Sequence, residues 1–173
     1  MSDTDAPAAP ESPRYVCGVD LGGRRARLCF LDPADQRHPL MVRLEPSVEM
    51  AKKKLGHLEH ARWAAAWAPA VWQHLDPSVV WFEEPRGRSQ RAVFQLSVMA
   101  GCLLGGLRPS ASVEFVTAGE CRKLVGLPGN VAKSGAIEWA TLETEADFVF
   151  DEHDADAFVV ARAILAHGER EDA

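Results

Sequence analysis

A short apolar run between two prolines constrains the fold of this chain more than any other feature. Residues 77–85 read PSVVWFEEP, and the segment from Val79 to Phe82 contains no polar residue. A strand with apolar side chains on both sides has to be covered on both faces, which is typical of a parallel strand flanked by helices. The run therefore predicts a buried, parallel strand in a sheet with helices packed on it.

The other predicted elements fit such a sheet. Strand-like patterns occur at residues 15–20, 26–31, 40–45 and 112–118. Turn-forming residues at 22–23 and 32–39 separate the first three, which predicts an antiparallel meander. Helical patterns occur at about 47–75, at 92–107, on either side of the GLPGN turn at 126–130, and at about 154–167. The order β-β-β-α-β-α-β-α-α-α predicts an α/β fold, a mixed five-stranded sheet with helices on both faces.

Two of the predicted helices have distinctive apolar surfaces. In the first, five residues at helical spacing would form one face: Trp63, Trp67, Ala70, Val71 and His74. Pro69 should kink or break this helix. The helix at 92–107 is apolar on two sides, one formed by Val93, Leu96, Ala100 and Leu103 and the other by Phe94, Val98 and Cys102. Such a helix is buried on both sides, either as a central core helix or against a partner subunit.

Length and charge bound the domain organisation. The chain has 173 residues, enough for one domain with a core, and no apolar run approaches the length of a membrane span. The start, MSDTDAPAAPESPR, is acidic and proline-rich and has no secretory signal, which predicts a disordered tail at 1–14 and a cytoplasmic protein. We expect one folded domain at 15–167 and a flexible tail at 168–173. Five of the six net negative charges lie in residues 1–13 and 168–173, so the bulk charge does not exclude a nucleic-acid partner.

The four cysteines do not have the spacing of a metal or redox motif. Cys17, Cys29, Cys102 and Cys121 include no CxxC pair, and three of them lie in apolar contexts. We therefore expect them to be buried small side chains rather than zinc ligands or disulfide partners.

Acidic residues occur at three places where a strand ends or a helix begins. Asp20 ends the first strand, Glu83 and Glu84 close the apolar strand, and DEHDADA at 151–157 opens the last helix. A carboxylate at the tip of a buried strand is costly unless it is paired or bound to a metal. If strands one and four are parallel neighbours, their acidic ends meet at one edge of the sheet. Oxygen-rich sites of this kind suit Mg²⁺ or Mn²⁺.

Each acidic residue also has a simpler interpretation. Asp154 fits an N-cap better than a metal ligand. Glu84 points to the opposite side from Glu83 and would pair with Arg86 or Arg88. Asp20 by itself would cap the turn that follows it. Only the three-part pattern raises these residues above such structural roles.

Four segments in order resemble the RuvC-type Holliday junction resolvases of the RNase H-like superfamily. They are GVDLG at the first strand, VVWFEEP at the buried strand, KLVGLPGNVAKSGAIEWA at the two short helices, and HDADAFVVARAI at the last helix. The resemblance covers roughly residues 15–166 and implies an RNase H-like fold.

The resemblance also implies roles for individual residues. The metal ligands would be Asp20, Glu83, His153 and Asp156, holding Mg²⁺, for which Mn²⁺ would substitute. Lys133 matches an active-site lysine of the family, and Arg122 and Lys123 lie near another basic position that would contact DNA. The family forms homodimers through the helix after the glutamate, which places Val93, Phe94, Val98 and Cys102 in an interface. The segment before that helix lacks the family's aromatic residue, and Arg86, Arg88 and Arg91 would contact DNA phosphates instead.

These features together predict a metal-dependent endonuclease that acts on four-way junctions and other branched DNA in recombination or repair. The sequence implies no membrane partner and does not identify a branch-migration motor. Three alternatives stay open: a nuclease for structured RNA, a non-catalytic DNA-binding relative, and an actin-like ATPase or sugar kinase. The last is disfavoured because that fold needs two lobes and the chain has a single D-x-G loop.

Overall fold

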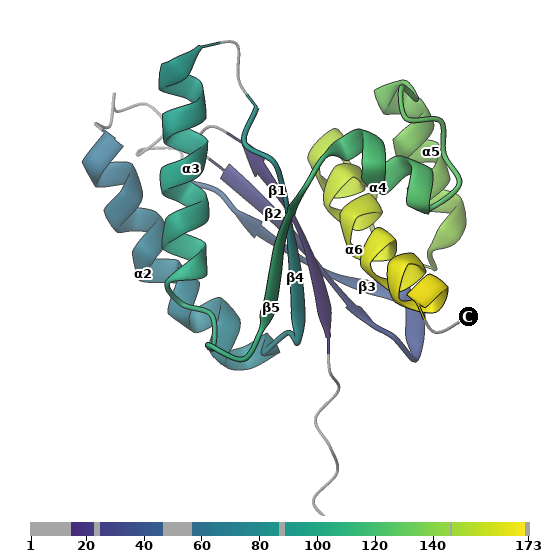
Figure 1. Cartoon of the computed structure of the whole chain (residues 1–173), viewed down its shortest axis with the longest axis horizontal. Helices are drawn as coiled ribbons and strands as arrows, with labels where there is room; N and C mark the ends of the chain where they lie inside the picture. The colour runs from purple at the N-terminus through teal and green to yellow at the C-terminus, as the bar shows by residue number, and fades with distance from the viewer. Residues whose placement is uncertain (1–14, 23–24, 47–56, 87–88, 146, 172–173) are drawn as a thin grey trace, which may run out of the picture.

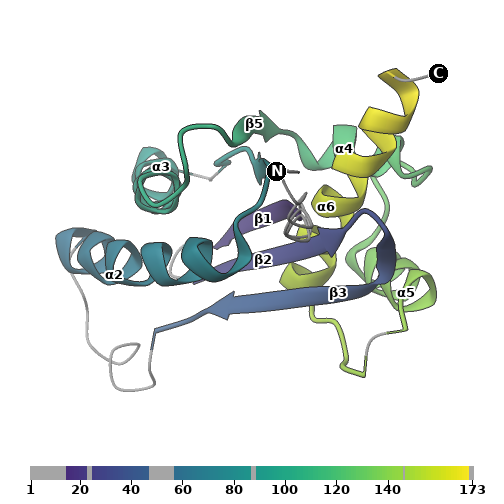
Figure 2. The same ribbon diagram turned by 90° about the horizontal axis from the view of Figure 1, so that it is seen from below.

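A five-stranded sheet lies between two layers of helices in the computed structural model of the chain (Figure 1). The structure describes residues 15–22, 25–46, 57–86, 89–145 and 147–171. Helices α2 (His57–Leu75) and α3 (Gln90–Leu104) cover one face of the sheet. Helices α4 (Ala118–Leu124), α5 (Lys133–Glu143) and α6 (Glu152–Glu171) cover the other (Figure 2). This arrangement confirms the predicted α/β sheet with helices on both faces.

The strand order in the sheet is β3-β2-β1-β4-β5. Strands β1 (Val16–Gly22), β2 (Arg25–Asp32) and β3 (Asp35–Leu44) form the predicted antiparallel meander. Strands β4 (Val79–Glu83) and β5 (Ser112–Val116) run parallel to β1. Strand β3 starts earlier than expected because the turn occupies residues 33–34 only, and it accommodates Pro39 because it lies at the edge of the sheet.

The apolar run of β4 is explained by the two cores on either side of it. Val80 and Phe82 are fully buried in the core beneath α2 and α3, and Trp81 is buried in the core beneath α6. Because successive side chains of a strand point to opposite faces, a strand between two cores needs apolar residues at every position.

Two expectations about the helices are altered, and one falls partly outside the described residues. Helix α2 continues through Pro69, whose side chain is exposed, so the predicted break is wrong. Part of the predicted first helix, residues 47–56, lies outside the described residues, as does the tail at 1–14. Helix α6 extends to Glu171, so most of the predicted tail at 168–173 is helical.

Most of the remaining core expectations are confirmed. Leu96, Ala100 and Leu103 of α3 are buried, as predicted for one of its apolar sides. The four cysteines are free, and Cys17, Cys29 and Cys121 are buried, whereas Cys102, also expected to be buried, is only partly buried. Within the described ranges, no helix is long and apolar enough to cross a membrane.

Helix α6 crosses β1 at backbone contact distance, at Gly18. A Cβ atom on Gly18 would lie 2.3 Å from both the carbonyl oxygen of Ala157 and the amide nitrogen of Ala161. Only glycine fits such a contact, and the small residues of α6 allow the approach. The contact brings the first turns of α6 to the end of β1, where Asp20 lies.

We predict that Gly18→Ala destabilises the fold by about 3 kcal/mol or more, because the added methyl group meets backbone atoms that cannot move aside. The matched control is Gly101→Ala in α3, where a Cβ atom meets nothing within 4 Å and where alanine favours the helix by about 0.5–1 kcal/mol. Urea unfolding of both variants is the measurement, and equal midpoints would contradict the close packing of α6 on β1.

Candidate active site

The predicted acidic residues meet at one end of the sheet. Val19 of β1 pairs with Phe82 of β4, and both side chains face the core beneath α2 and α3. The next residues, Asp20 and Glu83, therefore point to the opposite face, toward α6. The parallel pairing of β1 and β4 thus places two carboxylates from distant parts of the sequence on the same side of the same edge.

The first turns of α6 complete this cluster. His153 Nδ1 lies 2.6 Å from Asp20 Oδ2, and the Asp20 side chain is buried. Asp156, one turn further along α6, accepts a hydrogen bond of 3.0 Å from Arg122 Nη2 of α4. Thr117 and Glu120 form a capping box that starts α4 directly after β5 and so fixes the direction from which Arg122 approaches.

The electrostatics of the cluster favour a bound cation. Burial raises the pKa of Glu83 to about 7, and the negative charges of Asp20 and Asp156 add to the effect, while Arg122 and Arg86 oppose it. Burial and the charge of Asp20 also raise the pKa of Asp156, against the hydrogen bond from Arg122. The hydrogen bond to Asp20 raises the pKa of His153. Carboxylates that repel one another in a partly buried site are stabilised by positive charge.

The side chains of the cluster have metal-binding chemistry but not the arrangement of a preformed site. In the described part of the chain, no three His, Cys, Asp or Glu side chains are arranged to hold a metal ion. An oxygen of Asp20 contacts His153, and an oxygen of Asp156 contacts Arg122. Three carboxylates and one imidazole nevertheless fit the chemistry of Mg²⁺ or Mn²⁺, for which those contacts would have to open.

The predicted basic residues Lys133, Arg122 and Lys123 differ in their contacts with the acidic cluster and in their exposure. Lys133, the first residue of α5, forms an ion pair with Glu152, which precedes His153, and its side chain is exposed. Arg122 is mostly buried and bonded to Asp156, so it belongs to the cluster itself rather than to an open DNA-binding surface. Lys123, its neighbour in the last turn of α4, is exposed.

The segment after β4 carries the other predicted DNA contacts. Glu84 accepts a hydrogen bond of 2.9 Å from Arg86 Nη2, which confirms the predicted pairing of Glu84. Arg91 is exposed in the first turn of α3, and Arg88 lies outside the described residues.

The predicted dimer residues of α3 do not share one environment. Phe94 is 57% exposed, while Val93 and Val98 are partly buried. The Cys102 thiol donates to the carbonyl oxygen of Ala61 in α2 at 3.3 Å, so it faces the interior of its own chain. Of the four residues, Phe94, Val93 and Val98 fit a surface for a second subunit better than Cys102 does.

A network of ion pairs beside the cluster was missed from the sequence. Asp154 is fully buried and pairs with Arg27 of β2 and Arg43 of β3. The prediction that Asp154 is the N-cap of the last helix is wrong: Asp151 accepts a hydrogen bond of 2.8 Å from the Asp154 amide and so caps α6. An arginine within the apolar strand ARLCFL was the available signal, because a charge in a buried strand needs a partner.

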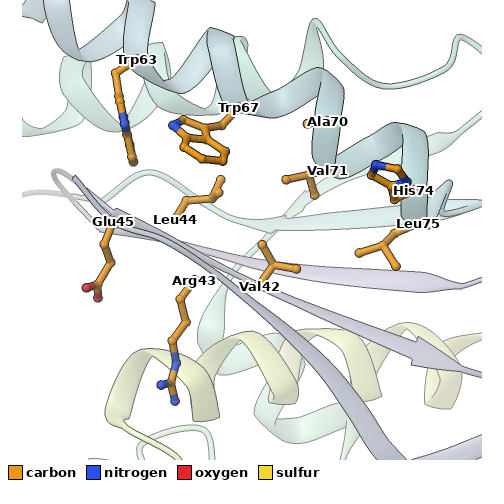
Figure 3. A pocket seen from close by; sticks show the side chains of 10 residues that line it. All are labelled: Val42, Arg43, Leu44, Glu45, Trp63, Trp67, Ala70, Val71, His74 and Leu75. Atoms are coloured by element: carbon orange, nitrogen blue, oxygen red, sulfur yellow. The ribbon is translucent and has the colours of Figure 1, made fainter. Parts of the chain in front are cut away.

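An apolar groove on the opposite face lies between β3 and α2 (Figure 3). Its volume is about 390 Å³. It is lined by Val42, Arg43 and Leu44 of β3, by Glu45 directly after that strand, and by Trp63, Trp67, Ala70, Val71, His74 and Leu75 of α2. All five residues of the predicted apolar face of α2 line it. The Arg43 side chain turns away from Trp67 toward α6, as Figure 3 shows, and joins the ion pairs with Asp154.

The fold is that of known junction resolvases, although the sequence is distant from them. No protein-family model and no curated protein sequence matches the chain. The Thermus thermophilus RuvC structure matches with a TM-score of 0.71 and 16% identity, over 91% of this chain and 96% of that one. RuvC of the same organism in complex with a Holliday junction substrate matches with a TM-score of 0.71 and 14% identity, over 90% and 95%. The yeast mitochondrial Holliday junction resolvase Ydc2 matches with a TM-score of 0.60 and 12% identity, over 97% and 85%.

We predict that Glu83→Gln stabilises the metal-free protein above pH 7 and has little effect near pH 4. The folded protein holds the Glu83 proton up to a pKa of about 7, whereas the unfolded chain releases it near 4.5. The wild type therefore loses stability as the pH rises from 4.5 to 7, by up to about 3 kcal/mol. Urea unfolding in the presence of a chelator measures the difference.

The control for this prediction is Glu84→Gln. Glu84 is the next residue, and it is paired with Arg86 at the surface. Its substitution should change stability little. Equal stability of the wild type and the Glu83→Gln variant at pH 8 would show that burial and the neighbouring carboxylates do not disfavour the charged form of Glu83.

Proposed function

We propose that this chain is a metal-dependent endonuclease that cleaves Holliday junctions and related branched DNA, with the acidic cluster as its active site. The observation that carries the proposal is the meeting of Asp20, Glu83, His153 and Asp156 at the ends of β1, β4 and α6. The shared fold with the two resolvases supports it, because the same layers would present the same edge of the sheet to DNA.

The cluster supplies the groups that phosphodiester hydrolysis needs. Asp20, Glu83, Asp156 and His153 would hold Mg²⁺, with Mn²⁺ as a substitute, and the ion when bound activates water and stabilises charge on the phosphate. Arg122 places a guanidinium beside Asp156, where it would attract a phosphate oxygen. Lys133 would turn from Glu152 to a phosphate that approaches α5. Glu83, with a pKa of about 7, holds or releases a proton near neutral pH before the metal binds.

DNA would approach across the exposed basic residues around this edge. Arg86, Arg91 and Lys123 are exposed, and Arg88 follows Arg86 by two positions in the sequence. Arg86 is paired with Glu84 at the surface, and such a pair is weak enough for a phosphate to replace the carboxylate. Binding through phosphates would weaken as the salt concentration rises. The cellular role we propose is DNA recombination or repair.

A homodimer would place two of these sites on one junction. The proposed interface is the side of α3 that carries Val93, Phe94 and Val98, and the large exposed fraction of Phe94 supports it. Two copies related by a twofold axis would cut two strands of a four-way junction symmetrically.

We predict that Asp20→Asn lowers cleavage of a synthetic four-way junction by at least about 100-fold, while junction binding stays largely intact. The assay compares the junction with a fork, a linear duplex and a structured RNA, each with Mg²⁺ or Mn²⁺. The matched control is Asp35→Asn, which changes an exposed aspartate paired with His38 at the start of β3. Paired nicks in the junction should persist in the control.

The other outcomes of this assay decide between the alternatives. Cleavage of the RNA in preference to all DNA substrates would favour a nuclease for structured RNA. Junction binding without cleavage in the wild type would favour a non-catalytic relative. Undiminished cleavage by Asp20→Asn would remove Asp20 from the mechanism.

We predict that Val98→Lys converts a dimer into a monomer, because a lysine would have to be buried without a partner in the proposed interface. The control is Ser97→Lys, at the neighbouring exposed position of α3. Light scattering should give about twice the chain mass of 18.9 kDa for the wild type and the control, and the chain mass for Val98→Lys. One unchanged mass for all three proteins would contradict the interface.

A further inference from the structure

Arg27 lies beside the proposed active site, on the strand next to Asp20. In the register of the sheet, Arg27 of β2 is paired with Asp20 of β1 on one side and with Arg43 of β3 on the other. Paired residues of neighbouring strands point to the same face, so Arg27 also points toward α6. Its side chain is almost completely buried, with 2% of the residue exposed.

The Arg27 guanidinium connects the sheet to the first turn of α6. Its Nη2 donates to Asp151 Oδ2 at 3.1 Å and also contacts Glu45 at the end of β3. Its Nε lies 3.0 Å from Asp154 Oδ1. Arg43 adds a second guanidinium to Asp154, with its Nε 3.1 Å from Oδ1. One buried arginine therefore contacts both the capping residue of α6 and the residue three positions later.

His153 lies between these two anchored residues. Asp151 and Asp154 are also joined to each other, because each backbone amide donates to the other's carboxylate, at 2.8 and 3.1 Å. The turn they close contains His153, whose Nδ1 lies 2.6 Å from Asp20. The position of His153, and of Asp156 one turn later, thus depends on where Arg27 and Arg43 hold this turn.

Fold stability by itself does not account for an arginine at this position. Within the described residues, Arg27 Nη1 has no hydrogen-bond partner, and Arg27 Nε is close to Asp154 without hydrogen-bond alignment. A buried guanidinium with unsatisfied N–H groups is costly, and an apolar side chain of similar size is often at least as stable. Cys29 and Leu31, which follow on the same face of β2, are apolar.

We propose that Arg27 is a positioning residue, which holds the first turn of α6 so that His153 and Asp156 converge on Asp20. The inference rests on the proposed function for its catalytic consequence, but the geometric claim concerns the protein itself. Without the Arg27 guanidinium, Arg43 still pairs with Asp154, but Asp151 loses its ion pair with the sheet. The turn carrying His153 is then free to shift. A displacement of the order of 1 Å is enough to slow catalysis about 100-fold.

The test uses three variants of the full chain. Arg27→Met removes the charge and keeps the length of the side chain. Arg27→Lys keeps the charge and loses the ability to contact Asp151 and Asp154 together. Arg27→Met combined with Asp154→Asn lowers the negative charge left in the turn, and the amide oxygen at position 154 can still accept from the Asp151 backbone amide. The control is Arg37→Met, which changes a residue of β3 and breaks its surface ion pair with Glu145.

Five properties are measured for each variant: stability in urea, junction binding, the cleavage rate at saturating junction, Mn²⁺ affinity, and the NMR signal of the His153 ring at a fixed pH. The His153 signal is assigned with His153→Gln, and calorimetric titration gives the Mn²⁺ affinity without any nucleic acid. We expect folded variants whose junction binding changes by no more than about twofold and whose cleavage falls at least about tenfold. The His153 signal should shift and Mn²⁺ affinity should fall at least about tenfold. Arg27→Lys should lose less cleavage and less Mn²⁺ affinity than Arg27→Met and should shift the His153 signal less. Arg37→Met should match the wild type.

The outcomes separate this inference from the proposed function. If the wild type cuts no nucleic acid but the Arg27 variants shift the His153 signal and weaken Mn²⁺ binding, the proposed function fails and the positioning role stands. If the wild type cuts junctions and Arg27→Met cuts as fast with an unchanged His153 signal, the positioning role is overturned. It is also overturned if none of the three variants folds, because Arg27 would then serve stability.

Discussion

The close contact between α6 and β1 at Gly18 is the constraint on which the rest of the structure depends. With the Ala157 carbonyl and the Ala161 amide of α6 so near, the helix cannot slide along the strand without a clash. Its first turns are therefore fixed at the end of β1. Alternation along β1 then points Asp20 at His153, and the parallel neighbour β4 points Glu83 to the same side.

Positive charge on two sides balances the acids gathered at this edge. Arg122 from α4 binds Asp156, and Arg27 and Arg43 from the sheet bind Asp154. The N-terminus of α6 adds its own preference for negative charge. In the described part of the chain no cation forms an ion pair with Glu83, and burial raises its pKa to about 7. Glu83, the carboxylate of the cluster with the least compensating positive charge, thus lies where a cation would be held.

The sequence predicted the parts of the fold and site that depend on periodicity, and missed those that depend on distant partners. The apolar run at 79–82 was enough to predict a buried, parallel strand, and strand-end acids were enough to predict the cluster. The role of Asp154 was misassigned because its partners, Arg27 and Arg43, lie more than a hundred residues away. The Cys102 side chain points to the interior because α3 packs against α2 at this position. Helical spacing within α3 does not specify that packing.

The most direct test of the central claim is to locate Mn²⁺ by anomalous diffraction from crystals of the protein soaked in that ion. We expect an anomalous peak among Asp20, Glu83 and Asp156, with His153 turned away from Asp20 to the metal or to one of its waters. We also expect Asp20→Asn crystals to lose the peak. Mn²⁺ bound elsewhere, or no ordered Mn²⁺ at this edge of the sheet in the wild type, would contradict a metal-dependent active site here.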